Sequence, residues 1–77
     1  MEYTKKQGQY LSFIYYYKKL HKVAPAHLDI QRYFESDPAS VNSMLKTLES
    51  KGFIRREKGK ARSIELLLKR EELPDLD

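Results

Sequence analysis

A run of cations near the C-terminal end of the chain has the composition of a phosphate-binding segment. Five basic side chains fall within eight residues, interrupted by a single acid, Glu57. They are Arg55, Arg56, Lys58, Lys60 and Arg62. Lysine and arginine neutralise phosphates and release the counterions around them, so the resulting binding weakens steeply as salt rises. A merely solvated turn is the alternative interpretation, and the density of charge favours phosphate contact.

A second group of side chains, earlier in the chain, is small, polar and nearly uncharged. It consists of Ala39, Ser40, Asn42, Ser43 and Lys46. In a DNA major groove, asparagine pairs with adenine, serine serves donors or acceptors, alanine touches a thymine methyl, and lysine reaches guanine or a phosphate. Serine and asparagine are poor helix formers, so their clustering on one predicted helix face favours base contact over an ordinary solvated face.

Other chemistry has little support in the sequence. Cysteine is absent, which excludes disulfides, thiol nucleophiles and thiolate metal sites. His21 and His27 lack a matched set of further ligands, so we expect no metal site. No nucleophile elbow, phosphate-binding glycine loop or HExxH motif occurs. We therefore expect no catalysis, no cofactor and no small-molecule substrate.

Three helices precede the run of cations. The first is predicted over residues 4–22, with Thr4 and Gln7 as a capping box. The second runs from Pro25 or Ala26 to Phe34 and has a weak cap. The third begins with Ser36 or Asp37 as cap and Pro38 at its first position, and Gly52 ends it. We expect Val41, Met44, Leu45 and Leu48 to pack it against Leu11, Ile14, Ile30 and Phe34.

After Gly52 the apolar period changes to that of strands. Residues 53–57 and 62–68 are predicted as two strands joined by a hairpin connection at 58–61. Three helices followed by a hairpin predict an α+β fold, a three-helix winged helix-turn-helix with a C-terminal two-stranded β-hairpin wing. In this fold the third helix enters the major groove and the wing contacts phosphates.

The chain is expected to form one small domain with a tail. At 77 residues it has room for a single core, predicted over residues 1–70. Residues 1–70 carry eight more basic than acidic side chains, while residues 71–77 hold four acids and no base. We predict a basic domain and a frayed, flexible acidic tail. There is no membrane-spanning run and no apolar signal segment, so a cytoplasmic, nucleoid-associated protein is expected.

Over roughly residues 4–68, the chain resembles the N-terminal DNA-binding domain of LexA-type repressors. The resemblance is carried by Thr4-Lys5-Lys6-Gln7, Leu11, Phe13-Ile14, Ala24-Pro25, Asp29-Ile30, the stretch from Pro38 through Leu45-Lys46-Thr47-Leu48-Glu49-Ser50-Lys51-Gly52-Phe53-Ile54, and Ala61-Arg62-Ser63-Ile64. It implies a winged helix whose third helix lies in the major groove and whose wing touches the DNA backbone. The family's base-reading positions correspond to Asp37, Ala39, Ser40, Asn42 and Ser43.

The chain also departs from the family pattern. Full LexA-type repressors also carry a self-cleaving serine-lysine domain that dimerises them, and we expect this chain to be a free-standing DNA-binding domain without it. Ala26 stands where the family has a serine or threonine cap, and the glycine common between helices 2 and 3 is absent from Tyr33-Phe34-Glu35-Ser36. The recognition face also differs from the one that reads the damage-response operators, so that target sequence is not carried over.

These observations predict a sequence-specific regulator of transcription, a repressor, that binds double-stranded DNA. A weak homodimer on DNA is expected, because a small DNA-binding domain usually needs to bind two half-sites as a dimer for useful affinity. Two alternatives stay open. A winged helix can serve protein contact, in which case binding would not depend on Asn42, or it can hold any duplex through phosphates alone. The operator, the regulated genes and any inducer cannot be read from the sequence.

Overall fold

The computed structural model describes residues 2–77 and begins with helix α1, Lys5–His21. Its start follows the predicted capping box. The Gln7 amide donates to Thr4 Oγ1 at 3.1 Å, and the Thr4 amide donates to Gln7 Oε1 at 3.0 Å. Two otherwise unpaired backbone groups at the helix start are thereby satisfied. The prediction of a helix over 4–22 is confirmed to within one residue at each end.

Helix α2, His27–Phe34, lacks a side-chain cap at Ala26, as expected. Asp29 compensates in part, because its Oδ2 accepts a hydrogen bond from the Ala26 amide at 2.8 Å. The helix ends at Glu35, whose φ of 51° places it in the left-handed region. Glycine adopts this conformation without strain, whereas other residues rarely do.

Helix α3, Pro38–Ser50, is the element that sequence reasoning described best. Asp37 caps it by accepting from the Ser40 amide at 2.7 Å, and Pro38 occupies its first turn. Beyond its C-terminal end, Gly52 takes a φ of 78° while the Phe53 amide donates back to the Leu48 carbonyl at 3.0 Å. This is the glycine-terminated helix end that the sequence predicted.

The two strands are present but shorter than predicted. β1 is Ile54–Arg55 and β2 is Glu65–Leu66; they pair antiparallel with Ile54 opposite Leu66 and Arg55 opposite Glu65. Residues 56–64, here called the wing loop, lie between the two strands and do not pair as strands. Inside the loop, Ser63 Oγ lies 3.0 Å from the Glu57 amide and 3.1 Å from its carbonyl, so a side chain replaces the expected strand hydrogen bonds.

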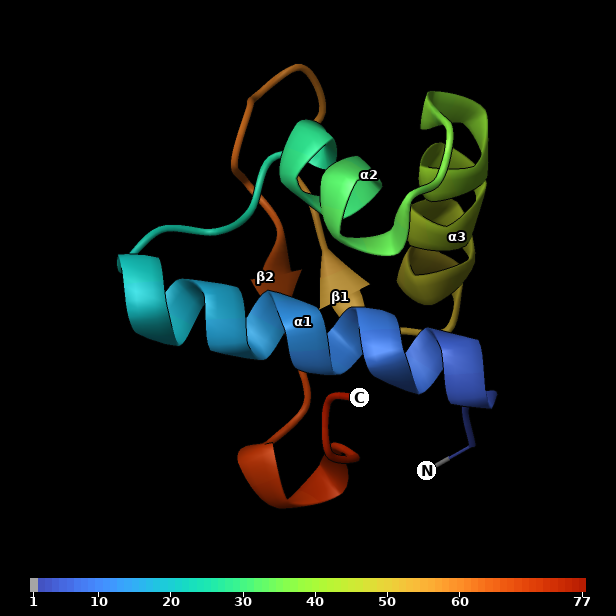
Figure 1. Cartoon of the computed structure of the whole chain (residues 1–77), viewed down its shortest axis with the longest axis vertical. Helices are drawn as coiled ribbons and strands as arrows, with labels where there is room; N and C mark the ends of the chain where they lie inside the picture. The colour runs from blue at the N-terminus through green and yellow to red at the C-terminus, as the bar shows by residue number, and fades with distance from the viewer. Residues whose placement is uncertain (1) are drawn as a thin grey trace.

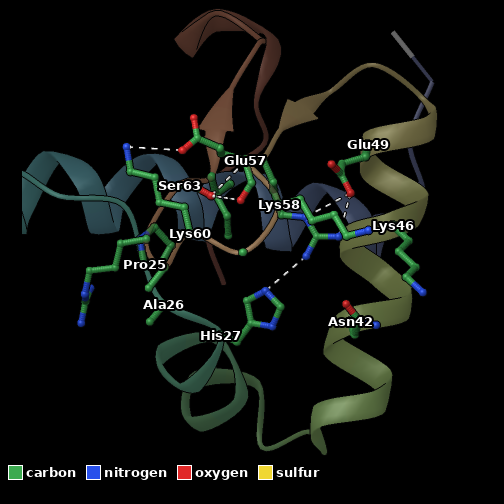
Figure 2. A pocket seen from close by; sticks show the side chains of 15 residues that line it. Pro25, Ala26, His27, Asn42, Lys46, Glu49, Glu57, Lys58, Lys60 and Ser63 are labelled. Carbon is green, nitrogen blue, oxygen red and sulfur yellow. Dashed lines mark hydrogen bonds and ion pairs between the residues drawn. The ribbon is translucent and has the colours of Figure 1, made fainter.

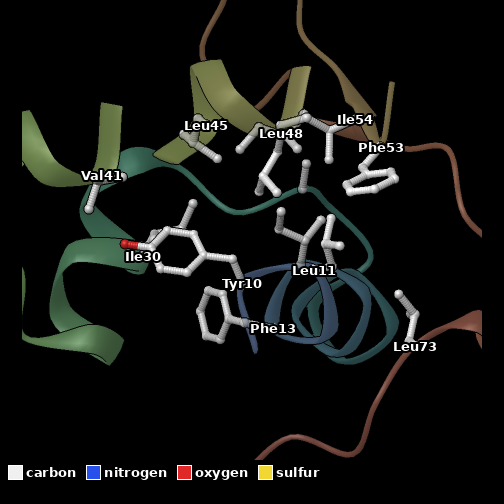
Figure 3. Close-up of a cluster of buried hydrophobic side chains, with 13 residues drawn as sticks. Tyr10, Leu11, Phe13, Ile30, Val41, Leu45, Leu48, Phe53, Ile54 and Leu73 are labelled. Carbon is white, nitrogen blue, oxygen red and sulfur yellow. The ribbon is translucent and has the colours of Figure 1, made fainter. Parts of the chain in front are cut away.

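One core joins the three helices to the hairpin (Figures 1 and 3). Its centre consists of five side chains with no exposed surface: Leu11, Ile30, Val41, Leu45 and Leu48. Tyr10 and Phe34 extend it by stacking their rings at 4.3 Å between centroids. Met44 and Phe34 are only partly buried but pack against this core, so the predicted packing of α3 is confirmed. No helix within residues 2–77 is long and apolar enough to cross a membrane.

The C-terminal segment differs from the expected frayed tail. It forms a short 3₁₀ helix at Arg70–Glu72 and then runs along α1 (Figure 1), and at its end the Asp77 carbonyl accepts a hydrogen bond from the Tyr33 hydroxyl of α2 at 2.9 Å. Leu73 is buried, the Tyr3 hydroxyl donates to the Glu72 carbonyl, and the Ser12 hydroxyl donates to the Pro74 carbonyl, both at 2.6 Å. Gly8 makes room, since a Cβ there would lie 2.9 Å from Pro74 Cγ.

This docking gives a stability prediction for Ser12→Ala. Ser12 has no exposed surface and its hydroxyl binds the Pro74 carbonyl, so its removal leaves that acceptor without its partner. We expect the free energy of unfolding to fall by about 1 kcal/mol in urea denaturation. Ser50→Ala is the matched control, because Ser50 is an exposed serine whose hydroxyl also binds a carbonyl, that of Thr47. Equal losses for the two variants would contradict the docking of residues 73–77.

Candidate nucleic-acid interface

Helix α3 presents one buried and one accessible side, and the predicted base-reading residues lie on the accessible side. Val41, Leu45 and Leu48 are buried. Five of the six predicted residues are exposed and Asn42 is half-buried. The exposed ones within the helix are Ala39, Ser40, Ser43 and Lys46. The accessible side therefore carries only short side chains and one flexible cation, which lets the helix backbone approach a surface closely.

A groove of about 690 Å³ lies between α3, the start of α2 and the wing loop. Figure 2 shows Asn42 and Lys46 extending from α3 and Lys58 and Lys60 extending from the wing loop around it. Pro25, Ala26 and His27 form its third side. The structure thus brings two of the predicted base-reading residues next to predicted phosphate-binding residues that lie 12 to 18 positions away in the sequence.

The other predicted base-reading residues lie elsewhere on the same helix. Ala39, Ser40 and Ser43 line a separate shallow hollow of about 440 Å³ with Gln7 of α1. Asp37 lines neither hollow, and its carboxylate accepts from the Ser40 amide. The hydrogen bonds from Ser40 are also the main reason why the pKa of Asp37 lies below its ordinary value. Asp37 is thus occupied as the cap of α3.

Most of the predicted phosphate-binding cations already have acidic partners. Arg55 pairs with Glu65 across the strands, and Lys60 Nζ lies 3.7 Å from Glu57. Arg56 is the least accessible of the five, with 16% of its side chain exposed, and donates to Glu49 Oε1 at 2.7 and 3.0 Å. Surface pairs of this kind contribute little and exchange readily, whereas the partly buried, two-bonded Arg56 is held in place.

Two cations facing the groove stand apart from these pairs. Among residues 2–77, neither Lys46 nor Lys58 takes part in an ion pair. Both are exposed and both line the groove. A flexible, unpaired ammonium group gives up only water when it meets a phosphate, so these two are the lysines best suited to bind one.

Sequence reasoning missed the residues that organise the groove. Glu49 and His27 both contact the Arg56 guanidinium, the latter with 3.2 Å between Arg56 Nη1 and His27 Nε2. Asp29 contacts Arg62, with 3.2 Å between Oδ2 and Nη1. These pairs join separate elements, so no spacing along the chain indicates them. Within residues 2–77, no cluster of three His, Cys, Asp or Glu side chains is arranged to hold a metal ion.

Two comparisons with known proteins bear on this surface. The family described as LexA DNA binding domain matches residues 1–63 of the chain. The LexA repressor of Verrucomicrobium spinosum is 40% identical over 62 residues, which make up 79% of this chain and 31% of that repressor. The chain therefore spans about a third of the length of this curated relative. The matched region contains α1, α2, α3, β1 and nearly all of the wing loop.

Proposed function

Because this chain belongs to the LexA DNA binding domain family, we propose that it binds double-stranded DNA sequence-specifically and represses transcription. In this proposal α3 lies in the major groove and the wing loop meets the adjacent phosphates. The observation that carries it is the groove shared by Asn42 and Lys46 of α3 with Lys58 and Lys60 of the wing loop. An amide suited to a base edge and cations suited to phosphates face one space.

The charge distribution supports the same proposal. Lys46, Lys58 and Lys60 are all exposed, and all line the groove. A major groove admits one α-helix, and the phosphates on its rim then come within reach of a loop beside that helix. Base contacts by Ala39, Ser40 and Ser43 would require α3 to contact DNA along its first two turns as well. Asp37 would meet the duplex at the helix start, where it also caps α3.

The test is selection from a randomised duplex pool at low salt, followed by sequencing of the bound fraction. An enriched motif is expected and would support sequence-specific regulation. Binding without enrichment would contradict it and favour a phosphate-only architectural binder. No binding at all would favour a winged helix used for protein contact.

The same selection tests the proposed weak homodimer. Closed dimers have two-fold symmetry, and the two half-sites they read form an inverted repeat about one helical turn apart. An inverted repeat in the enriched motif would therefore support dimeric binding. A single half-site would contradict it and indicate a monomer on DNA.

A further inference from the structure

Arg62, like Arg56, contacts residues outside the wing loop. Its backbone takes a left-handed φ of 53°, a conformation that non-glycine residues rarely adopt. Its Nη1 lies 3.1 Å from the Ala24 carbonyl oxygen, 3.2 Å from the Tyr17 hydroxyl and 3.2 Å from Asp29 Oδ2. The guanidinium carbon also lies 5.9 Å from the centre of the Tyr17 ring. The side chain is therefore directed at the body of the domain.

These contacts join three segments at one point. Tyr17 belongs to α1, Ala24 to the connection after it, and Asp29 to the first turn of α2. Asp29 is itself fixed, because its Oδ2 also accepts from the Ala26 amide at 2.8 Å. That backbone hydrogen bond is the main cause of its lowered pKa, to which the Tyr17 hydroxyl and the Arg62 charge add. Arg62 thus meets an ionised carboxylate that is already held in position.

The wing loop depends on such contacts because its own scaffold is small. Each strand of the hairpin has only two residues, and the loop between them has nine. Arginines hold the loop near both ends. Arg56 binds Glu49 of α3 at one end, and Arg62 binds Tyr17 and Asp29 at the other. The tip between them carries Lys58 and Lys60.

We propose that Arg62 is a positioning residue, which orients the wing loop through Tyr17 and Asp29 and raises duplex affinity without binding a phosphate itself. This inference rests on the proposed function. It reassigns one of the five cations expected to contact the DNA backbone. An arginine that satisfies three acceptors on the protein would have to break charge-assisted hydrogen bonds to reach a phosphate, whereas Lys58 has no ion pair within residues 2–77 to break.

The test replaces the partners of Arg62, so that no cation of the wing loop changes. Tyr17→Phe removes one acceptor without changing the charge. Asp29→Asn keeps an oxygen to cap α2 but removes the ion pair. Glu71→Gln is the matched control, because it also removes one carboxylate, from an exposed position in the 3₁₀ helix, which lies on the other side of α1 from the wing loop (Figure 1). Lys58→Gln serves as the control for a lost phosphate contact.

Two quantities are measured: the salt-dependent Kd for a duplex, and the ¹⁵N order parameters of residues 57–63 in the free protein. Tyr17→Phe and Asp29→Asn are expected to weaken binding about tenfold, the size of one hydrogen bond to a charged group, with an unchanged salt slope. Their wing-loop order parameters should fall from about 0.85 toward 0.6 or below. Lys58→Gln should instead lower the slope by about one unit and leave the loop ordered.

Two results would overturn the inference. In one, both partner variants keep the affinity and wing-loop order of the wild type. In the other, Asp29→Asn strengthens binding, which would mean that Asp29 acts only as a negative charge near DNA. Should Asp29→Asn fail to fold, Tyr17→Phe decides alone. Should the wild type bind no duplex, the proposed function fails, and the order parameters still show whether Arg62 anchors the loop.

Discussion

Replacing Leu45 with alanine is expected to lower the free energy of unfolding by about 2 to 5 kcal/mol. Leu45 has no exposed surface and lies in the core where α3 meets α1 and α2 (Figure 3). Alanine would leave a cavity that the fixed backbones of three helices cannot fill. Small domains have only about 5 to 15 kcal/mol in total, so the variant should lose a large part of its stability. Urea denaturation and thermal melting followed by circular dichroism measure the loss.

Leu20→Ala provides the control for Leu45→Ala. It makes the same chemical change at a leucine that is 76% exposed, so its effect should stay within about 0.5 kcal/mol. The difference between the two losses in unfolding free energy reports the effect of burial, because both variants share the change in helix propensity and side-chain entropy. If Leu45→Ala melted within a few degrees of the wild type, the placement of α3 in the core would be wrong.

Replacing Asn42 with alanine is expected to weaken binding to the selected duplex by about 1 to 3 kcal/mol, with little effect on a random duplex. Asn42 is half-buried on α3 and faces the groove shared with the wing loop (Figure 2). Its amide can donate and accept at once, and alanine would leave an adenine edge without partners. Titrations of both duplexes at one salt concentration measure the difference.

Lys58→Gln is the informative comparison for Asn42→Ala. Lys58 lines the same groove but is suited to a phosphate, so its loss should weaken binding to both duplexes alike and reduce the salt slope. Equal losses on both duplexes for Asn42→Ala would contradict base reading at that position. A melting curve for each variant separates these effects from loss of folded protein.

The fold could be predicted well because its determinants are local. The cap at Asp37, the proline that follows it and the apolar spacing of Val41, Leu45 and Leu48 define α3 within one stretch of chain. Gly52 then ends it with a φ of 78° that glycine adopts without strain.

The docking of the C-terminal segment could not be predicted for the opposite reason. It depends on Gly8 and Ser12, which lie more than 60 residues from the Pro74 that packs on them. A glycine inside a helix indicates lost stability when only the local sequence is considered. Its use as a close approach for a distant proline ring becomes visible only in three dimensions.

For the candidate site, too, local features could be predicted from the sequence and contacts between distant residues could not. The accessible side of α3 follows from helical periodicity, so the chemical types of Asn42 and Lys46 could be placed in advance. Which cations form ion pairs could not be predicted, because Arg56 and Arg62 pair with Glu49 and Asp29 on other elements. Charge density along the chain therefore predicted a phosphate-binding segment without showing which arginines hold the loop.

The position of the C-terminal segment also has a consequence for how the molecule approaches a partner. The segment 70–77, which carries the four acids Glu71, Glu72, Asp75 and Asp77, packs against α1 at the end of the molecule opposite the wing loop (Figure 1). The separation of charge gives the domain a permanent electric dipole. The electric field of a polyanion orients such a domain before contact, so that the lysines face the polyanion and a larger share of encounters leads to binding. Capture should therefore be fast at low ionic strength and slow as the Debye length shrinks.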